Sequence, residues 1–268
     1  MRPLGVIGPL ARDIVAGAQP RVGGGPWHAG RALRALGRDA VLAVKCGAEE
    51  RDSYLRRLAT LGLPAALSAA GETTAFSFRY DPDGRREMRV EAIGEPWDED
   101  DEPSRLLSRV EWLHVTPLLR DDFPPELLGR LARGRRLLLD AHGLVRRRKL
   151  GPVELDGEFD RGLLQHVSIL KLAEEEARAI VGDGDLEELR GLGVPEILVT
   201  FGAEGSLVLT RGTSERIRTH ALAADPTGAG DGFAAAYLAG RAGGHSPASA
   251  ARRASALVSS LLTTAAPR

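Results

Sequence analysis

Short apolar runs alternate with longer amphipathic stretches along most of this chain. The apolar runs have the length of buried strands and lie at Leu4–Ile7, Val41–Val44, Trp112–Val115, Leu137–Leu139, Val167–Leu170 and Ile197–Thr200. Stretches with helical periodicity lie at about residues 29–36, 50–60, 124–132, 173–181 and 229–240. Strands separated by helices favour βαβ units, in which helices cover both faces of a mostly parallel sheet. The pattern therefore predicts an α/β fold.

One segment, Thr73–Ala92, departs from this alternation. Two strand-like runs flank the sequence Asp-Pro-Asp-Gly at 81–84, whose residues favour a tight turn. We predict a β-hairpin here, as part of a small β lid inserted at about residues 65–92; an ordinary edge hairpin is the alternative. No repeat or long linker divides the chain, and 268 residues can build one α/β core, so residues 1–268 are predicted to form a single domain.

Composition narrows the class of protein. The chain has 36 Lys and Arg against 37 Asp and Glu, so no nucleic-acid partner is expected. No apolar run reaches membrane-spanning length, and Arg12 and Asp13 interrupt the N-terminal apolar run, so neither a membrane segment nor a signal peptide is expected. The single cysteine, Cys46, fits a reducing compartment. These features predict a cytoplasmic protein and leave both a monomer and a homodimer open.

Residue usage is biased in a way that affects motifs. Asn does not occur in the chain, and Lys45, Lys149 and Lys171 are the only lysines among the basic residues. Codon bias in a GC-rich genome explains this pattern, and a heat-tolerant source is the alternative. Any family motif that uses Asn must therefore be altered here.

The segment Asp225–Asp231 carries the clearest chemical signal. Its sequence, Asp-Pro-Thr-Gly-Ala-Gly-Asp, leads directly into an Ala-rich helical stretch. The side chains of Gly228, Ala229 and Gly230 are small enough for an anion to approach the N–H groups at a helix start. Asp231 would lie beside that anion, where it could accept the proton of an attacking hydroxyl. The segment indicates phosphoryl transfer, and an Asp-capped helix after a Gly-rich turn is the alternative.

Two common nucleotide-binding motifs do not account for phosphate binding. No lysine lies in the Gly-Lys-Ser/Thr context of a Walker A loop. The stretch Gly23–His28 does not fit the dinucleotide pattern Gly-x-Gly-x-x-Gly, because position 28 is His. Residues 225–231 therefore remain the strong candidate for the phosphate-binding segment.

The sequence of residues 225–233 resembles the C-terminal signature of the PfkB/ribokinase family of small-molecule kinases. Gly23-Gly24 with Leu36-Gly37 resembles the N-terminal signature, Lys171–Ala177 the segment Lys-x-Asn-x-x-Glu-Ala, and Thr200–Gly205 the turn Thr-x-Gly-x-x-Gly beside the nucleotide. The four segments agree in order and spacing over nearly the whole chain. The resemblance implies a three-layer ribokinase-like (Rossmann-like) α/β sandwich with a mostly parallel central sheet and a small β lid, and it implies ATP and Mg²⁺ as co-substrate and cofactor.

The resemblance also implies a role for each matching residue. Asp231 corresponds to the catalytic base, and the N–H groups of Gly228, Ala229 and Gly230 to the anion hole. Acceptor binding is implied for Asp13, Gly24, Gly25, His28, Lys45 and Arg146. Nucleotide binding is implied for Lys171, Thr200, Gly202, Gly205, Gly228 and Gly230. Glu176 matches the acidic residue that organises magnesium, and Asp225 and Thr227 match positions that hold a monovalent cation in some members.

Three positions depart from the family pattern, which has Asn at each. His28 alters the acceptor pocket, Ala173 removes a polar group near the metal, and His142 ends the sequence Asp140-Ala141-His142 where the family has Asp-x-Asn. For Arg146 and Lys45, surface charges without a role in the site are the alternative. The branch with the best resemblance is the inositol-kinase type, on the segments Gly23–Gly25, Lys45-Cys46, Arg79–Asp83 and Asp140–Arg146.

This branch implies transfer of the γ-phosphoryl group of ATP to a hydroxyl of a sugar or polyol, with myo-inositol as the first candidate. A ribose- or fructose-type sugar kinase and a nucleoside kinase are the alternatives within the family. Three Trp, three Tyr and six Phe residues offer few aromatic rings for stacking a nucleobase, which counts against a nucleoside. A polyol-sensing binding protein without catalysis is the alternative outside enzymes.

Overall fold

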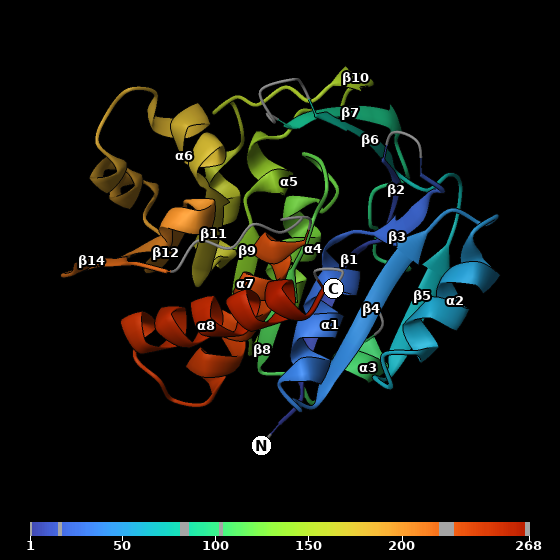
Figure 1. Cartoon of the computed structure of the whole chain (residues 1–268), viewed down its shortest axis with the longest axis horizontal. Helices are drawn as coiled ribbons and strands as arrows, with labels where there is room; N and C mark the ends of the chain where they lie inside the picture. Colours follow the sequence, from blue (N-terminus) through green and yellow to red (C-terminus); the bar gives the residue numbers. More distant parts are fainter. Residues whose placement is uncertain (1, 16–17, 81–85, 102–103, 220–227, 266–268) are drawn as a thin grey trace.

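A large sheet runs through the centre of the molecule (Figure 1). The computed structural model describes residues 2–15, 18–80, 86–101, 104–219 and 228–265. Within these ranges the sheet has nine strands in the order β14-β13-β12-β11-β9-β8-β1-β4-β5. Strands β12 to β5 of this order pair in parallel, and β13 and β14 are antiparallel at one edge. The strands are β1 (Leu4–Pro9), β4 (Ala40–Cys46), β5 (Ala65–Ala69), β8 (Trp112–Val115), β9 (Arg136–Asp140), β11 (Ile169–Ala173), β12 (Glu196–Thr200), β13 (Ser206–Thr210) and β14 (Ser214–Ile217).

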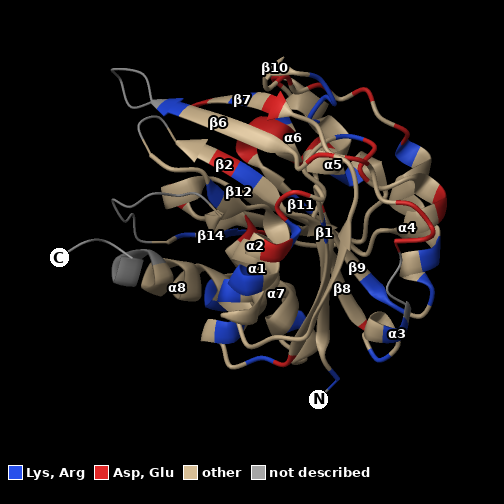
Figure 2. Cartoon of the chain, turned by 90° about the vertical axis from the view of Figure 1, so that its right-hand side faces the viewer, with Lys and Arg blue, Asp and Glu red and all other residues tan. Residues whose placement is uncertain are grey.

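Helices cover both faces of this sheet. Figure 2 shows the sheet nearly edge on, with α7 and α8 on one side and α3 and α4 on the other. No helix of the described ranges combines the length and the apolar composition that a bilayer span requires. The helices are α1 (Gly25–Ala35), α2 (Arg51–Ala59), α3 (Ser104–Leu107), α4 (Pro125–Ala132), α5 (His142–Val145), α6 (Glu174–Val181), α7 (Ala229–Ala242) and α8 (Pro247–Ala265), with 3₁₀ turns at Arg161–His166, Leu186–Leu192 and Gly202–Glu204.

Continuous apolar runs form the central strands because both of their faces are buried. In β4, Leu42 and Val44 pack in the cluster that includes Ala29 of α1. Val41 and Ala43 point to the opposite face, where they pack with the cluster that includes Leu127 of α4. Successive side chains of a strand alternate between faces, so a run without polar positions is what a two-sided core requires.

A second, smaller sheet lies above one end of the large one (Figure 1). In the described part of the chain it has five strands in the order β10-β7-β6-β2-β3. Its apolar residues form their own cluster, which includes Phe76, Phe78, Val90 and Leu119. The strands are β2 (Ala11–Val15), β3 (Arg21–Gly23), β6 (Ala75–Tyr80), β7 (Arg86–Ala92) and β10 (Gly151–Pro152).

The structure confirms the predicted α/β class, the six predicted strands and the mostly parallel sheet. The hairpin is confirmed as the antiparallel pair β6 and β7, and its predicted turn at 81–84 lies outside the described residues. The predicted limits of the lid, 65–92, were wrong. Ala65–Ala69 pairs in parallel with β4 in the large sheet, while β2, from the N-terminal part of the chain, pairs with β6. Leu67 packs on the core beside α1, and this burial draws the segment to the large sheet.

Candidate active site

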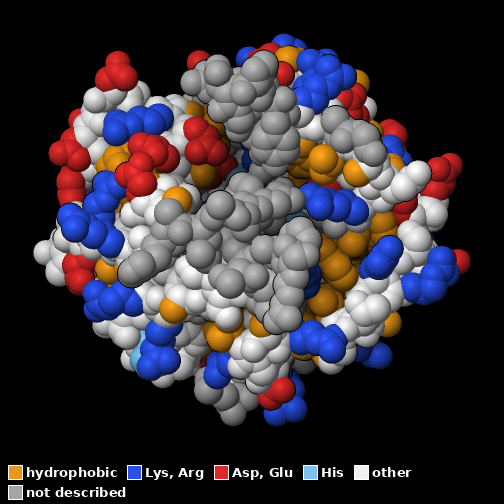
Figure 3. Space-filling model, in the orientation of Figure 1, with side chains coloured by type: hydrophobic (Ala, Val, Ile, Leu, Met, Phe, Trp, Pro, Cys, Tyr) orange, Lys and Arg blue, Asp and Glu red, His pale blue; other side chains and the backbone are white. Residues whose placement is uncertain are grey.

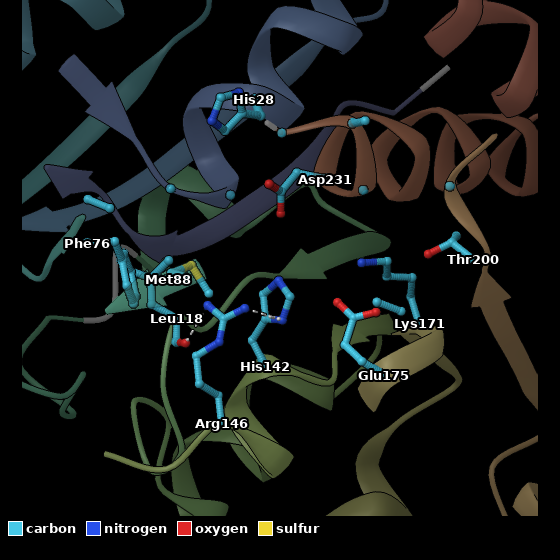
Figure 4. A pocket seen from close by; sticks show the side chains of 18 of the residues that line it. His28, Phe76, Met88, Leu118, His142, Arg146, Lys171, Glu175, Thr200 and Asp231 are labelled. Carbon is cyan, nitrogen blue, oxygen red and sulfur yellow. Dashed lines mark hydrogen bonds between the residues drawn. The ribbon is translucent and has the colours of Figure 1, made fainter. Parts of the chain in front are cut away.

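A cavity of about 470 Å³ opens at the carboxyl ends of the parallel strands, beneath the second sheet. Ligands of open α/β sheets bind at this edge, where helices begin and strands end. Figure 4 shows Phe76, Met88 and Arg146 at one end of the cavity and Lys171 and Thr200 at the other, with Asp231 between them. The predicted site residues that line it are Asp13, Gly24, Gly25, His28, Arg146, Lys171, Thr200, Gly202, Gly228, Ala229, Gly230 and Asp231.

The first turn of α7 faces this cavity. Gly228 is the N-cap and has a φ of 78°, a left-handed conformation that favours glycine. A Cβ at Gly228 would lie 2.0 Å from Nδ1 of His28, so the backbone and the imidazole pack tightly together. The first helical hydrogen bond of α7 runs from Gly232 N–H to the Gly228 carbonyl, which leaves the preceding N–H groups without an intrahelical acceptor. Asp231, in that turn, lines the cavity beside them.

The end of the cavity nearest the second sheet combines polar and apolar walls. Asp13 of β2 is buried, and its carboxylate packs against the backbone of Gly23. Arg146 donates from Nη1 to the Leu118 carbonyl at 3.2 Å, and its guanidinium lies 5.5 Å from the ring centre of Phe76. The apolar wall consists of Phe76, Phe78, Met88 and Leu118. The polar groups at this end can bind hydroxyls of a neutral ligand, and the apolar wall can pack against a nonpolar face of its ring.

The opposite end places a fixed positive charge beside the start of α7. Lys171 of β11 is buried, and its ammonium lies 3.2 Å from Oδ1 of Asp140. A Cβ at Gly230 would lie 2.9 Å from Lys171 Nζ, so the ammonium is next to the N-terminal turn of α7. Burial lowers the pKa of Lys171, but the charges of Asp140, Glu176 and Asp231 outweigh this effect and hold its pKa above the ordinary value. The amine is therefore charged and can attract phosphate oxygens.

Glu176, predicted to organise magnesium, is placed behind the cavity wall. Its Oε2 accepts a hydrogen bond from the Ala173 N–H at 2.8 Å, and its Oε1 accepts one from Nδ1 of His142. The neighbouring Glu174 and Glu175 line the cavity instead. Figure 3 shows acidic side chains gathered over α6, the helix that these residues begin. Both carboxylate oxygens of Glu176 are thus engaged in holding the start of α6 and the imidazole of His142.

We predict that Glu176 makes folding sensitive to acid. Burial raises its pKa, but His142, Lys171 and Arg146 outweigh burial and lower the pKa from 4.5 to about 2. A depressed carboxyl pKa stabilises the fold above the unfolded value, and this stability is lost as the pH falls from 4.5 to about 2. A pKa shift of this size corresponds to about 3 kcal/mol in the free energy of unfolding. Denaturant unfolding at pH 7 and pH 3 measures it: the stability gap between the wild type and Glu176→Gln should narrow at pH 3, and an unchanged gap contradicts the assignment.

Two other predicted site residues lie away from the cavity lining. Lys45 donates to the Pro96 carbonyl at 2.9 Å and forms a buried ion pair with Asp101, so the structure does not bring its ammonium to the cavity. Gly205 has a φ of 104°, and a Cβ there would lie 1.9 Å from the Ile217 carbonyl oxygen. It shapes the turn between β12 and β13, whereas Gly202 of that turn lines the cavity.

The described residues bear on the predicted metal only in part. Asp225 and Thr227, predicted to hold a cation, lie outside the described residues. Among the described residues no three His, Cys, Asp or Glu side chains form a cluster that could hold a metal. Magnesium in phosphoryl-transfer sites takes one or two carboxylates together with the substrate phosphates. The Glu175 carboxylate, which lines the cavity as Lys171 does, fits such a ligand.

Sequence reasoning missed part of the lining. His142 lines the middle of the cavity (Figure 4), whereas the sequence indicates it only as a departure from a family motif. The apolar wall was also missed, although alternation in the hairpin places Phe76 and Phe78 on one face of β6. Three of the six Phe side chains, Phe76, Phe78 and Phe201, line this cavity, so the small number of aromatic residues in the chain does not count against an aromatic ligand.

Known proteins resemble this chain over most of its length. A cytidine kinase of Thermococcus kodakarensis is 28% identical over 213 residues, which cover 74% of this chain and 72% of that protein. A pyrophosphate-dependent kinase of the ribokinase family, solved with a pyrophosphate analogue and myo-inositol, is 26% identical with a TM-score of 0.81, covering 97% of this chain and 94% of that one. A pyrophosphate-dependent myo-inositol-1 kinase converted into a myo-inositol-3 kinase is 25% identical with a TM-score of 0.83, covering 98% and 94%.

These structures confirm the ribokinase-like fold and are consistent with the inositol-kinase branch. Residues 15–266 match the family described as pfkB family carbohydrate kinase. This chain belongs to the pfkB family of carbohydrate kinases, which are phosphotransferases that act on hydroxyl groups.

Proposed function

We propose that this kinase transfers the terminal phosphoryl group of ATP to a hydroxyl of a cyclic polyol, with myo-inositol as the first candidate. The observation that carries the proposal is the position of Asp231. It lies between the end of the cavity that holds Asp13 and Arg146 and the end that holds Lys171. A carboxylate in that position can accept the proton of an acceptor hydroxyl on one side while that hydroxyl attacks a phosphate on the other.

Each part of the reaction is assigned to a described group. The acceptor ring binds between Asp13, His28 and Arg146, and Asp231 takes the proton from the attacking hydroxyl. The N–H groups of the first turn of α7 stabilise the charge on the transferred phosphoryl oxygens. When bound, magnesium neutralises charge on the donor phosphates, and Glu175 would hold it. Catalysis then rests on positioning and electrostatics.

Pyrophosphate is a second candidate for the phosphoryl donor. The two solved kinases described above, which are 26% and 25% identical to this chain, are pyrophosphate-dependent. The donor end of the described cavity offers Lys171 and the N-terminal turn of α7, groups that bind phosphates rather than a nucleobase. These groups suit the phosphates of either donor.

A nucleoside is a second candidate for the acceptor. The wall of Phe76, Phe78, Met88 and Leu118 can pack against a flat, weakly polar ring. The relative from Thermococcus kodakarensis is a cytidine kinase, which favours the same class of acceptor. Cyclic polyols also present C–H groups to such a wall, so the wall is compatible with both acceptors.

A matrix of donors and acceptors tests the proposal. Purified protein with magnesium and either ATP or pyrophosphate is incubated with myo-inositol, other polyols, ribose, fructose, cytidine or inosine, and ³¹P NMR identifies any phosphate ester. We expect an ester of myo-inositol with at least one donor, formed faster than any other. An ester of cytidine alone would replace the polyol by a nucleoside. Binding of a polyol without any ester would favour a sensor and contradict the proposed kinase activity.

A further inference from the structure

A row of three polar side chains lies buried beneath the start of α7. His114 of β8 and Asp140 of β9 have no exposed surface, and Lys171 of β11 is 2% exposed. Nε2 of His114 donates to Oδ2 of Asp140 at 2.7 Å, and Lys171 Nζ lies 3.2 Å from Oδ1 of the same carboxylate. The carboxylate of Asp140 is therefore shared between an imidazole and an ammonium.

The strand register explains why these side chains meet. Strands β8, β9 and β11 are neighbours, and Lys171 is directly opposite Asp140 in the ladder. Asp140 shares its sheet face with Leu138, and Lys171 shares its face with Ile169. Leu138 and Ile169 pack in the cluster that contains Phe233 of α7. The row consequently lies on the face that α7 covers and ends at the cavity.

The ends of the row differ in their access to a ligand. Lys171 lines the cavity, with its ammonium beside Gly230, whereas Asp140 and His114 are not part of the lining. A lysine side chain has many rotamers, and an ion pair with a buried carboxylate restricts them. Burial raises the pKa of Asp140, but Lys171 and His114 outweigh burial and hold that pKa well below its usual range. Asp140 is thus a fixed negative charge that can hold Lys171.

Stability alone does not account for such a row. Charges in a protein interior lose their hydration, and well-packed apolar residues are often as stabilising as a buried ion pair. The surrounding positions of the same strands, including Leu139, Leu170 and Leu172, are apolar and buried. The one member that reaches the cavity is a cation at the donor end.

We propose that Asp140 and His114 are positioning residues, which hold the Lys171 ammonium against the donor phosphates at the N-terminal turn of α7. The inference rests on the proposed function for the identity of that anion as the donor. Asp140 and His114 therefore strengthen donor binding without touching the donor. Acceptor binding depends on residues at the other end of the cavity.

The test compares binding and kinetics in Lys171→Met, Asp140→Asn, His114→Leu and the double variant Lys171→Met/Asp140→Asn. Isothermal titration with pyrophosphate measures the anion affinity of each purified full-length protein directly. Loss of a charge-assisted contact predicts about 10- to 100-fold weaker binding in Lys171→Met. Asp140→Asn should weaken binding by about 10-fold or more and His114→Leu by less. The double variant should match Lys171→Met, because Asp140 acts through the lysine.

Steady-state kinetics separate positioning from general damage. We expect the donor KM to rise in Asp140→Asn while the acceptor KM stays within about twofold of the wild type. Glu196→Gln is the matched control: Glu196 is also buried on this sheet and accepts from Tyr237 and Arg241 of α7, but at the other end of that helix. It should lose thermal stability without any change in the donor KM.

Equal pyrophosphate affinity in Asp140→Asn and the wild type would overturn the inference. So would a fall in donor and acceptor affinity by the same factor. If Asp140→Asn does not fold, the same measurements on His114→Leu test the inference. Pyrophosphate affinity equal to that of the wild type would then overturn it. If the wild type transfers no phosphate but binds pyrophosphate more tightly than these variants do, the proposed function fails and the positioning role stands.

Discussion

Asp231→Asn is expected to lower kcat by at least about 100-fold, the lower range for the loss of a general base. The amide keeps the size of the carboxylate but cannot accept the hydroxyl proton. Asp231 lines the cavity in the first turn of α7 and is only partly buried, so the fold should persist. Initial rates at saturating donor and acceptor measure the effect, and thermal melting confirms that the variant is folded.

Two controls make the Asp231 result specific. KM values for donor and acceptor should stay within a few-fold of the wild type, because the carboxylate acts on the proton in the transition state. Asp231→Glu keeps the acid but moves it, and some activity should return relative to Asp231→Asn. A folded Asp231→Asn protein with near-normal kcat would remove Asp231 from the proposed mechanism.

Gly228→Val is expected to reduce kcat/KM by about 100-fold or more, the effect of losing a donor from an anion hole. A β-branched residue does not fit the φ of 78° at this N-cap. Its Cβ would also lie 2.0 Å from Nδ1 of His28, so the turn or the imidazole must move. Either movement displaces groups that line the cavity. The measurement is turnover at subsaturating acceptor, together with the melting temperature.

Gly232→Ala provides the matched control for Gly228→Val. Gly232 belongs to the same helix, and outside that helix a Cβ there would meet nothing nearer than the Ala32 Cβ at 3.7 Å. Alanine favours helix over glycine by up to about 1 kcal/mol, so stability should hold or rise. Activity should stay close to the wild type. If both substitutions reduced activity equally, the specific geometry at Gly228 would not explain the loss.

Local sequence patterns were sufficient to predict the central strands of the large sheet. Strands such as β4 and β12 are continuous apolar runs because both faces of the sheet are covered, and such runs are visible in the sequence. The pairing of β2 with β6 was not visible, since the strands are separated by more than fifty residues and their partners depend on tertiary packing. The assignment of Ala65–Ala69 to the large sheet was missed for the same reason.

The site could be predicted where the chemistry is concentrated in a short segment. Gly228, Ala229, Gly230 and Asp231 are consecutive, and their arrangement follows from the start of a single helix. Lys45 shows the opposite case. Its position at a strand end predicts a place in the acceptor pocket, but the loop that carries Asp101 supplies a buried partner that no local pattern indicates.

The sequence by itself determined the α/β class, the family and the segment with the proposed catalytic base, because apolar periodicity and a contiguous Gly-rich helix start are local properties of the chain. Only the tertiary structure decided that Phe76 and Phe78 line the end of the cavity nearest the second sheet and that Glu176 is hydrogen-bonded to His142. It also decided that Asp140 joins His114 to Lys171. These contacts join residues from different strands and helices, and burial in a shared core sets their partners.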